Sequence, residues 1–411
     1  MAGTDGGQGR PTLLVLASTY PRWVNDPEPG FVHELARRLT GRFRVIALCP
    51  HAPGALTTER MDGVEVVRYR YAPARLETLV NDGGVVANLR RQPWKWLLVP
   101  GFVLMQAWRA WRLCQTQKVA VIHAHWLIPQ GVIAAALQWL PGRPTPFLVT
   151  SHGTDLYALR GRVLAALKRW VLRRAGAATV VSTAMRDEMA ALGVDVGKVS
   201  VLPMGVDMHG RFQPQEGMGR SSSELLFVGR LIEIKGLRYL IDALPAVLRE
   251  RPEVTLTIAG FGPDEPALRA QVAAKGLGEA VRFLGAVPQQ ELPRLYQRAA
   301  LLVAPFVQGQ SGSQEGLGLV LVEAIGCGCP VIAGKMRALA DVFGTGADDY
   351  IVDPREDGAL AAAILRVLDQ PDHAAKQAMH MRAALLDRLD WSVSSQRYGD
   401  LASQLLESAS E

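Results

Sequence analysis

Apolar runs of strand length alternate with helical patterns along most of the chain. The run Leu13–Leu16 is followed by a loop and by a helical pattern over residues 31–39. A continuous apolar run of this length fits a strand that is buried on both faces. Alternating strands and helices indicate parallel strands joined by crossover helices. We therefore expect the strands of the first half at residues 12–17, 44–49, 64–70, 119–124, 147–151, 179–182 and 199–203.

A second strand–helix series begins after a stretch that has no periodicity. Residues 204–223 contain four glycines, a proline and three consecutive serines, which is typical of an inter-domain linker. A chain of 411 residues also exceeds the ~250–300 residues at which a single core stops growing. In the second half we expect strands at residues 225–228, 254–259, 281–284, 301–304, 330–333 and 350–352.

The pattern therefore predicts an α/β protein of two doubly wound parallel-sheet domains that face each other across a cleft, where ligands of such sheets bind. The helical pattern near the C-terminus can either complete the second domain or cross back to the first. The expected parts are a disordered N-terminus at 1–10, an N-terminal domain at 11–203, a linker at 204–223, a C-terminal domain at 224–390 and a C-terminal helix at 391–411.

Composition narrows the classes of function. The net charge of +6 suits anionic substrates or an anionic membrane surface, and it is too small to indicate binding of nucleic acid. Four cysteines scattered through a long chain predict a reducing, cytoplasmic environment without a disulfide framework. No apolar run reaches the ~20 residues that span a bilayer.

The most informative stretch is Glu315–Glu323, in which seven glycine or aliphatic residues separate two glutamates. It predicts a loop ending at Glu315, a glycine-rich turn, and a buried helix with Glu323 in its second turn. The start of a helix attracts phosphate through unpaired N–H groups, and a carboxylate can accept two hydrogen bonds from a ribose diol. We interpret the stretch as a sugar-nucleotide site. The alternative is a buried helix with an acid at each end.

Two cations follow the first strand of the second series. Arg230 comes directly after the strand and Lys235 lies five residues later, just before a helical pattern. Arg offers a planar fork for phosphate oxygens and Lys a mobile point charge, so this pair can neutralise a departing diphosphate. The alternative is two surface cations in a loop.

The stretch Ser151–Asp155 ends a strand of the first domain and includes His152. This His can donate to a sugar hydroxyl, while Asp155 is equally well interpreted as a helix N-cap. His123 and His125 share one strand face, but no third ligand has a metal-site spacing, so we expect no metal there. The tight turn at residues 259–263 lets the backbone approach a nucleotide or simply turns the chain.

Two segments suggest contact with a membrane. Residues 94–111 contain four tryptophans, which indicates either an interfacial helix or a helix that covers a sheet. Basic residues then recur through a helical pattern, which suits an anionic membrane, a lipid-diphosphate acceptor or simply a solvated face. These basic residues are Arg160, Arg162, Lys168, Arg169, Arg173 and Arg174.

In this order and spacing, the motifs resemble the retaining family 4 glycosyltransferases, whose members have the GT-B fold of two Rossmann-like domains. The resemblance covers about residues 12–405. Its carriers are SHGTDL at 151–156, VLPMGVD at 201–207, FVGRLIEIKG at 227–236, LTIAGFGP at 256–263, VRFLGAV at 281–287 and EGLGLVLVEAIGCGCPVIA at 315–333. The chain departs from the family pattern in the proline-rich loop at 20–30, at Met204, and at residues 335–337.

The resemblance implies an enzyme of the hexosyltransferase type. Its substrate would be a UDP- or GDP-sugar, it would need no metal or other cofactor, and its acceptor would be a glycan or a lipid-linked precursor. It would act in the cytoplasm, peripherally at the inner face of the membrane. Together, motifs and resemblance assign catalysis to His152, Arg230, Lys235 and Glu315, donor binding to Gly229, Gly262, Gly316, Leu317, Gly318, Leu319 and Glu323, and the acceptor side to Gly30, His125 and Asp155.

Two other functions stay open at this point. A sugar-nucleotide epimerase or hydrolase of similar fold would convert the donor without an acceptor, and a silent scaffold would bind the nucleotide without turnover. The charged residues at 230, 235, 315 and 323 favour an enzyme. A nicotinamide dehydrogenase is disfavoured because the turn at residues 259–263 lacks the third glycine of a dinucleotide fingerprint.

Overall fold

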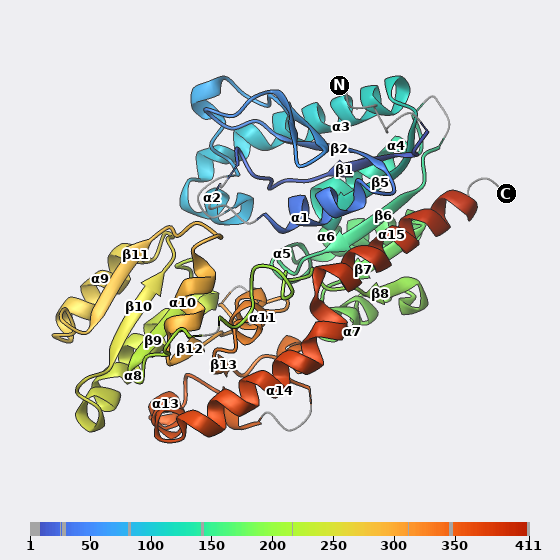
Figure 1. The fold of residues 1–411 in the computed structure, drawn as a ribbon. Helices are drawn as coiled ribbons and strands as arrows, with labels where there is room; N and C mark the ends of the chain where they lie inside the picture. The colour runs from blue at the N-terminus through green and yellow to red at the C-terminus, as the bar shows by residue number, and fades with distance from the viewer. Residues whose placement is uncertain are drawn as a thin grey trace, which may run out of the picture. The chain divides into compact units, whose positions relative to one another are not determined.

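The chain forms two compact units, each built on one sheet (Figure 1). The predicted α/β class with two doubly wound sheets is confirmed. The first unit runs to Val181 and adds Met185–Met204 and the residues from Ser395 onward, and the second holds Ser182–Ala184 and Gly205–Ser394. The computed structural model describes residues 9–24, 26, 30–80, 84–140, 144–215, 217–310, 312–344 and 348–408, so most of the stretch expected to be disordered at 1–10 lies outside the described residues.

The sheet of the first unit has eight strands in the order β3-β4-β2-β1-β5-β6-β7-β8. All neighbours are parallel except β3, which pairs antiparallel with β4. The central strand β1 is fully buried, as its continuous apolar run predicts. The strands are β1 Thr12–Leu16, β2 Arg44–Pro50, β3 Thr58–Met61, β4 Val64–Tyr69, β5 Val119–His125, β6 Phe147–Ser151, β7 Ala177–Val180 and β8 Val199–Val201.

One strand of this unit lies two residues away from its predicted position, and one strand was not predicted at all. The strand expected at 179–182 lies at Ala177–Val180, because the small residues Ala177 and Ala178 belong to the buried strand and Ser182 to the turn after it. The strand β3 is missing from the expectations because its sequence Thr-Glu-Arg-Met is polar. An edge strand that exposes most of its side chains carries no apolar run to reveal it.

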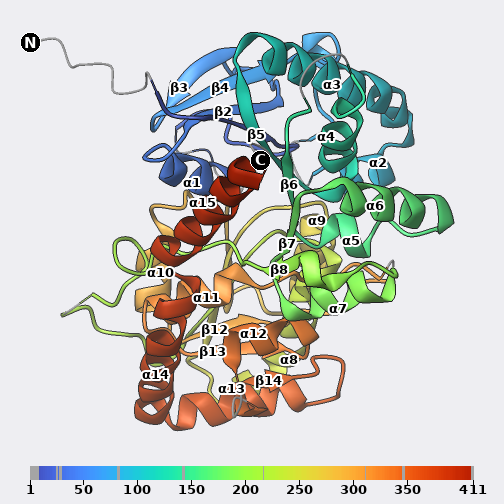
Figure 2. The same cartoon turned by 90° about the vertical axis from the view of Figure 1, so that its right-hand side faces the viewer.

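Helices cover both faces of this sheet. In Figures 1 and 2, α3 and α4 lie on one side of the sheet, and α1 and α15 lie on the other. The helices are α1 Phe31–Leu39, α2 Val85–Arg91, α3 Val99–Thr116, α4 Val132–Leu137, α5 Thr154–Tyr157, α6 Arg162–Arg174, α7 Thr183–Ala191 and α15 Trp391–Ser408, of which residues 395–408 belong to this unit.

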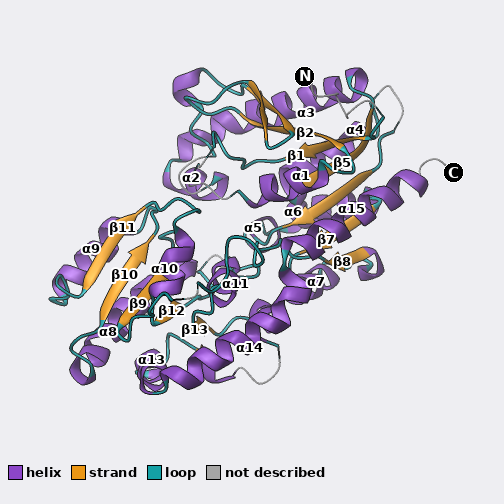
Figure 3. Cartoon of the chain, viewed as in Figure 1, coloured by secondary structure: helices purple, strands orange, loops and turns teal. Residues whose placement is uncertain are grey.

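The second unit has six parallel strands in the order β11-β10-β9-β12-β13-β14, with helices around them (Figure 3). Its strands are β9 Glu224–Val228, β10 Thr255–Ala259, β11 Val281–Gly285, β12 Leu301–Ala304, β13 Val331–Gly334 and β14 Ile351–Val352. Its helices are α8 Leu237–Glu250, α9 Glu265–Ala274, α10 Leu292–Arg298, α11 Leu319–Gly326, α12 Ala340–Phe343, α13 Ala359–Asp369 and α14 Pro371–Leu389.

The segment expected as a linker is packed against this second unit. Met208 and Phe212 are buried, and the Arg220 guanidinium donates to the carbonyls of Tyr296 and Ala299 at 2.9 and 2.6 Å. Glycine and serine remove the periodicity of residues 205–223, but these contacts still hold the segment in place. Within the described residues, no helix combines the length and apolarity needed to cross a membrane.

Candidate active site

The loops that follow β9 and β12 meet at one edge of the second sheet. From β9 the chain moves to β10 and β11 on one side, and it returns to β12 on the other side of β9. Such a reversal of strand order opens a crevice at the carboxyl ends of the two strands, where ligands of α/β sheets bind. The β9 loop carries Arg230 and Lys235, and the β12 loop leads to Glu315.

Lys235 and Glu315 form an ion pair at this edge. The Nζ of Lys235 donates to Oε2 of Glu315 at 2.6 Å, and both side chains are mostly buried. Burial raises the pKa of Glu315, but the charge and hydrogen bond of Lys235, the Gly318 amide and the Arg230 charge outweigh it, so the pKa lies below its ordinary value. The structure therefore joins one predicted cation to one predicted carboxylate.

Backbone contacts hold the two loops together. The amide of Val307 donates to the Ile234 carbonyl at 3.0 Å, and the amide of Gln310 donates to the Glu233 carboxylate at 3.0 Å. Gly236 has a φ of 70°, and a Cβ there would lie 1.8 Å from the Pro305 carbonyl oxygen, so only glycine fits. These contacts fix the backbone on which Lys235 stands.

The start of α11 lies beside this ion pair. Gly318 occupies the N-cap with a φ of 82°, and its amide donates to Oε1 of Glu315 at 3.2 Å. The structure gives the amides of Gly316, Leu317 and Leu319 no acceptor among the described residues. The predicted glycine-rich turn thus presents polarised N–H groups near two cations, an arrangement that can bind an anion.

Glu323 lies in the second turn of α11, as expected, and it is buried. Its Oε2 accepts a hydrogen bond from the Tyr296 hydroxyl at 2.8 Å. Burial raises the pKa of Glu323 to about 7, although Tyr296, Arg211, Gln289 and Lys235 all lower it. The Lys235 charge acts on both carboxyls, so the structure brings Lys235, Glu315 and Glu323 into one electrostatic cluster.

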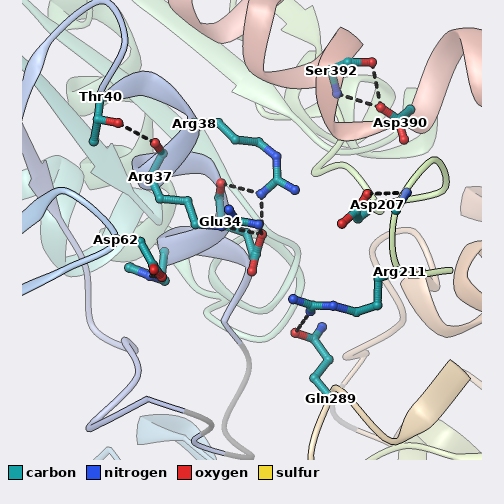
Figure 4. Close-up of polar contacts among 12 residues, drawn as sticks. Glu34, Arg37, Arg38, Thr40, Asp62, Asp207, Arg211, Gln289, Asp390 and Ser392 are labelled. Carbon is teal, nitrogen blue, oxygen red and sulfur yellow. Dashed lines mark hydrogen bonds and ion pairs between the residues drawn. The ribbon is translucent and has the colours of Figure 1, made fainter.

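Three residues around Glu323 were not foreseen. Arg211 donates to Oε1 of Gln289 at 3.0 Å (Figure 4). Gln289 and Tyr296 in turn hydrogen-bond Glu323. Arg211 lies in the segment expected as a linker, and Gln289 lies in the loop before α10. No local motif marks either one, and only the order of the strands could have placed the α10 region beside α11.

The glycines of the turn after β10 allow the loop after β9 to pack closely against this turn. A Cβ on Gly260 would lie 1.9 Å from the carbonyl oxygen of Gly229, and one on Gly262 would lie 2.4 Å from that of Leu231. The amide of Leu231 also donates to the Phe261 carbonyl at 2.8 Å. The two loops therefore pack backbone to backbone. These contacts fix the backbone on both sides of Arg230, at Gly229 and at Leu231.

We expect Gly262→Ala to lower the free energy of unfolding by about 2–3 kcal/mol, because the new methyl group would clash with the Leu231 backbone. Urea denaturation measures this effect. Gly278→Ala is the matched control, since a Cβ on Gly278 would have no neighbour within 4 Å. Equal stability of the two variants would contradict the close packing of these loops.

A histidine cluster lies at the carboxyl ends of β5 and β6 in the first unit. Nδ1 of His125 and Nε2 of His152 share a hydrogen bond of 2.9 Å, and the two rings stack with centroids 5.1 Å apart. Burial lowers the pKa of His152 to about 3 and that of His125 well below its ordinary value. Both rings are therefore neutral, and His152 can exchange a hydrogen bond with a sugar hydroxyl through Nδ1.

Asp155 positions the loops that carry this cluster, and its interpretation as an N-cap is wrong. The N-cap of α5 is Gly153, and Asp155 is buried. Its carboxylate accepts hydrogen bonds from the Leu127 amide at 2.7 Å, the Ser151 hydroxyl at 2.9 Å and the His152 amide at 3.3 Å. A buried carboxylate with these three donors organises the loops after both strands.

The start of α1 also reaches this cluster. Gly30 is the N-cap of α1, and the next residue, Phe31, places its ring 4.9 Å from that of His152. Glu34 in the first turn pairs with Arg37 at 2.7 Å, which supports the helix (Figure 4). Residues 27–29 of the proline-rich loop that precedes Gly30 lie outside the described residues.

The orientation of His123 follows from a chain of hydrogen bonds. Tyr398 of α15 donates to the Leu202 carbonyl at 2.7 Å, so its oxygen accepts from Thr179 at 3.3 Å. Thr179 then accepts from Thr150 at 2.6 Å, and Thr150 accepts from Nε2 of His123 at 2.8 Å. The Nε2 of His123 is thus engaged in a hydrogen bond, and its ring lies against that of His125 with centroids 4.1 Å apart. These contacts suit a residue that forms a wall of the site. Among the described residues, no three His, Cys, Asp or Glu side chains lie close enough to hold a metal.

Comparisons with known proteins agree with this architecture. Residues 31–209 match the family model for Glycosyltransferase Family 4, and residues 211–383 match that for Glycosyl transferases group 1. The chain is 29% identical to a glycogen synthase of Mycobacterium tuberculosis, across 92% of this chain and 91% of the relative. It is 32% identical to a phosphatidyl-myo-inositol mannosyltransferase of Mycobacterium leprae, across 66% of this chain and 70% of the relative.

A solved structure shares the fold. The Anabaena protein HepE, in complex with UDP and glucose, superposes with a TM-score of 0.71 at 19% identity, across 96% of this chain and 100% of that one. The sequence resemblance described above is thus confirmed. The chain belongs to the family 4 glycosyltransferases, enzymes of the GT-B fold.

Proposed function

We propose that this glycosyltransferase moves a sugar from a UDP- or GDP-sugar to an acceptor hydroxyl with retention of the anomeric configuration. The observation that carries the proposal is the 2.6 Å ion pair of Lys235 and Glu315 beside the start of α11. This position combines a cation for the diphosphate, N–H groups for phosphate oxygens and a carboxylate for the transferred sugar. UDP and glucose in the HepE complex support a nucleotide-sugar donor.

Each residue of the cluster has a role in the proposed reaction. Arg230 and Lys235 stabilise the charge that grows on the diphosphate as the glycosidic bond breaks. These cations take the part that a divalent metal plays in other transferases, so the reaction needs no metal. Glu315 positions the transferred sugar, and Glu323 accepts hydrogen bonds from the ribose hydroxyls. The departing diphosphate accepts the proton of the acceptor hydroxyl from the same face of the sugar.

The acceptor is proposed to be a lipid-linked glycan or a polysaccharide precursor. Support comes from the names of the relatives, one of which is a phosphatidyl-myo-inositol mannosyltransferase and another a glycogen synthase. His152 would contact the acceptor as a neutral hydrogen-bonding partner, with Phe31 against its ring. The enzyme would act in the cytoplasm, at the inner face of the membrane.

Binding and slow hydrolysis of a panel of UDP-, GDP- and ADP-sugars, with and without EDTA, test this function. We expect saturable, EDTA-resistant binding of one donor by the wild type, and its loss in Glu323→Ala. The anomeric coupling in the NMR spectrum of the transfer product tests retention. Rapid conversion of the donor without an acceptor would favour an epimerase or hydrolase, and absence of binding to every donor would favour a silent scaffold.

A further inference from the structure

Exposed apolar side chains concentrate on one helical layer of the first unit. Of the fifteen large hydrophobic residues exposed in the described part of the chain, nine lie between Trp94 and Val163. They sit on α3, on the 3₁₀ turn that precedes it, at the end of α4 and on α6. They are Trp94, Trp96, Leu97, Leu104, Met105, Trp108, Trp139, Leu140 and Val163.

Helix α3 has two apolar faces, and only one of them meets the protein. Phe102 and Ala110 recur at helical spacing on the buried face, which covers the sheet. On the outer face, Leu104 is 66% and Trp108 45% exposed. The two interpretations of this segment, an interfacial helix and a helix that covers a sheet, therefore describe opposite faces of one helix.

The neighbouring helices continue this outer face. Helix α4 packs against both α3 and α6, so the three helices follow one another over the sheet (Figure 2). At the end of α4, Trp139 is 66% exposed, and its ring lies 5.3 Å from that of Trp170 on α6. The Arg174 guanidinium covers both rings, 4.6 and 5.2 Å from their centroids.

The charge of this layer has one sign. No Asp or Glu occurs between Asp82 and Asp155, whereas Arg90, Arg91 and Arg112 of this stretch are exposed. Arg112 also lies over the Trp108 ring, 5.6 Å from its centroid. Arginine interleaved with tryptophan suits the boundary between water and an anionic bilayer, where the ring is half-buried and the cation meets phosphate.

Helix α6 contributes less basic surface than its sequence indicates. Lys168 is buried, and its Nζ donates to the carbonyls of Leu156 and Leu159 at 2.8 and 2.7 Å. Lys168 therefore holds the loop after α5 and cannot face a membrane. Arg162, Arg173 and Arg174 remain exposed on this helix.

We propose that the outer surface of α3 and its preceding turn, formed by Trp94, Trp96, Leu97, Leu104, Met105 and Trp108, docks the enzyme on an anionic lipid bilayer. We call it the tryptophan face. The absence of acids favours a bilayer over a protein partner, because a protein surface of mixed charge would meet no complementary carboxylate here. The tryptophan face belongs to the first unit, whereas Lys235, Glu315 and Glu323 belong to the second, so this proposal does not depend on the identity of the donor.

Sedimentation with lipid vesicles tests this surface. We expect the wild type to bind vesicles of phosphatidylcholine mixed with phosphatidylglycerol and to bind pure phosphatidylcholine at least about tenfold more weakly, because anionic lipid attracts the basic residues. Trp94→Ser/Trp108→Ser should weaken binding to the mixed vesicles by about tenfold or more, since the apolar anchors are lost. The matched control, Leu284→Ser/Met379→Ser, changes two exposed apolar residues of the second unit and should bind like the wild type.

Several outcomes of these measurements would contradict the proposal. Equal binding to both kinds of vesicle, or unchanged binding of the tryptophan variant, would overturn it. A wild type that ignores vesicles but forms a dimer in light scattering, with a monomeric Trp94→Ser/Trp108→Ser variant, would make the face a contact between copies. Donor hydrolysis in vesicle-free buffer reports the active site separately, and the tryptophan variant should retain it.

Discussion

Lys235→Ala is expected to lower turnover by about 10²–10³-fold while the Kd of the donor changes by less than about tenfold. The Lys235 ammonium stands at the switch point of the second sheet, and in the proposed reaction it meets the negative charge that would grow on the diphosphate as the sugar leaves. An interaction that strengthens in the transition state supports turnover more than ground-state binding. Stopped-assay kinetics with the donor found in the panel, together with calorimetric Kd values, separate the two effects.

The Lys235→Ala variant also removes the ion-pair partner of Glu315. An unpaired carboxylate in a mostly buried site destabilises the fold, by about 3 kcal/mol for a fully buried pair and by less here, where both side chains keep some contact with water. Lys235→Ala/Glu315→Gln removes that charge and should recover stability without recovering turnover. Lys275→Ala is the control, because Lys275, just after α9, pairs with Asp242 of α8 at 2.9 Å and both side chains are partly exposed. Normal turnover of Lys235→Ala would make the proposed mechanism wrong.

Glu323→Ala is expected to raise the Kd of the donor by about 10²–10³-fold, because two hydrogen bonds to a charged acceptor would be lost. The pKa of Glu323 is raised to about 7 by burial, so the carboxyl changes its charge near neutral pH. A ribose diol donates to the ionised form. Donor affinity of the wild type should therefore weaken as pH falls through about 7, and that of Glu323→Gln should be weak and flat.

Stability should change with pH in the opposite direction. The folded pKa of Glu323 is about 7 and its ordinary value is 4.5, so the folded state binds the proton more tightly than the unfolded state. The resulting stabilisation, about 3 kcal/mol, is fully present below pH 4.5 and is lost as pH rises through about 7. Urea unfolding of wild type and Glu323→Gln across this range measures it, with Glu279→Gln, an exposed site, as control. Parallel curves for wild type and Glu323→Gln would rule out the raised pKa.

Local patterns were sufficient to predict that Lys235, Glu315 and Glu323 lie close together. Lys235 follows a strand and Glu315 precedes an apolar helix, and parallel sheets bring the carboxyl ends of strands to one edge. The placement of Glu323 in the second turn of α11 follows from the helical period alone. Each of these residues lies within or close to the strand or helix that positions it. Its place at the edge of the sheet can therefore be deduced from the sequence.

Residues that contact the site from segments distant in sequence could not be predicted in this way. Tyr296 and Gln289 meet Glu323 only through the packing of the α10 region beside α11, and Arg211 arrives from a segment that has no periodicity. For Asp155, a local pattern led to a wrong prediction. Its local pattern indicates a cap, but burial and a partner at Leu127 on another loop decide its role.

The return of α15 to the first unit has a consequence for the order of folding during synthesis. Tyr398 completes the hydrogen-bond chain that ends at His123, and Arg42 forms an ion pair with Asp400 at 2.5 Å. The first unit therefore lacks one of its own helices until the ribosome has passed the end of the second unit. The second unit is almost continuous in sequence and can close earlier, so the half that is translated first is expected to be finished last.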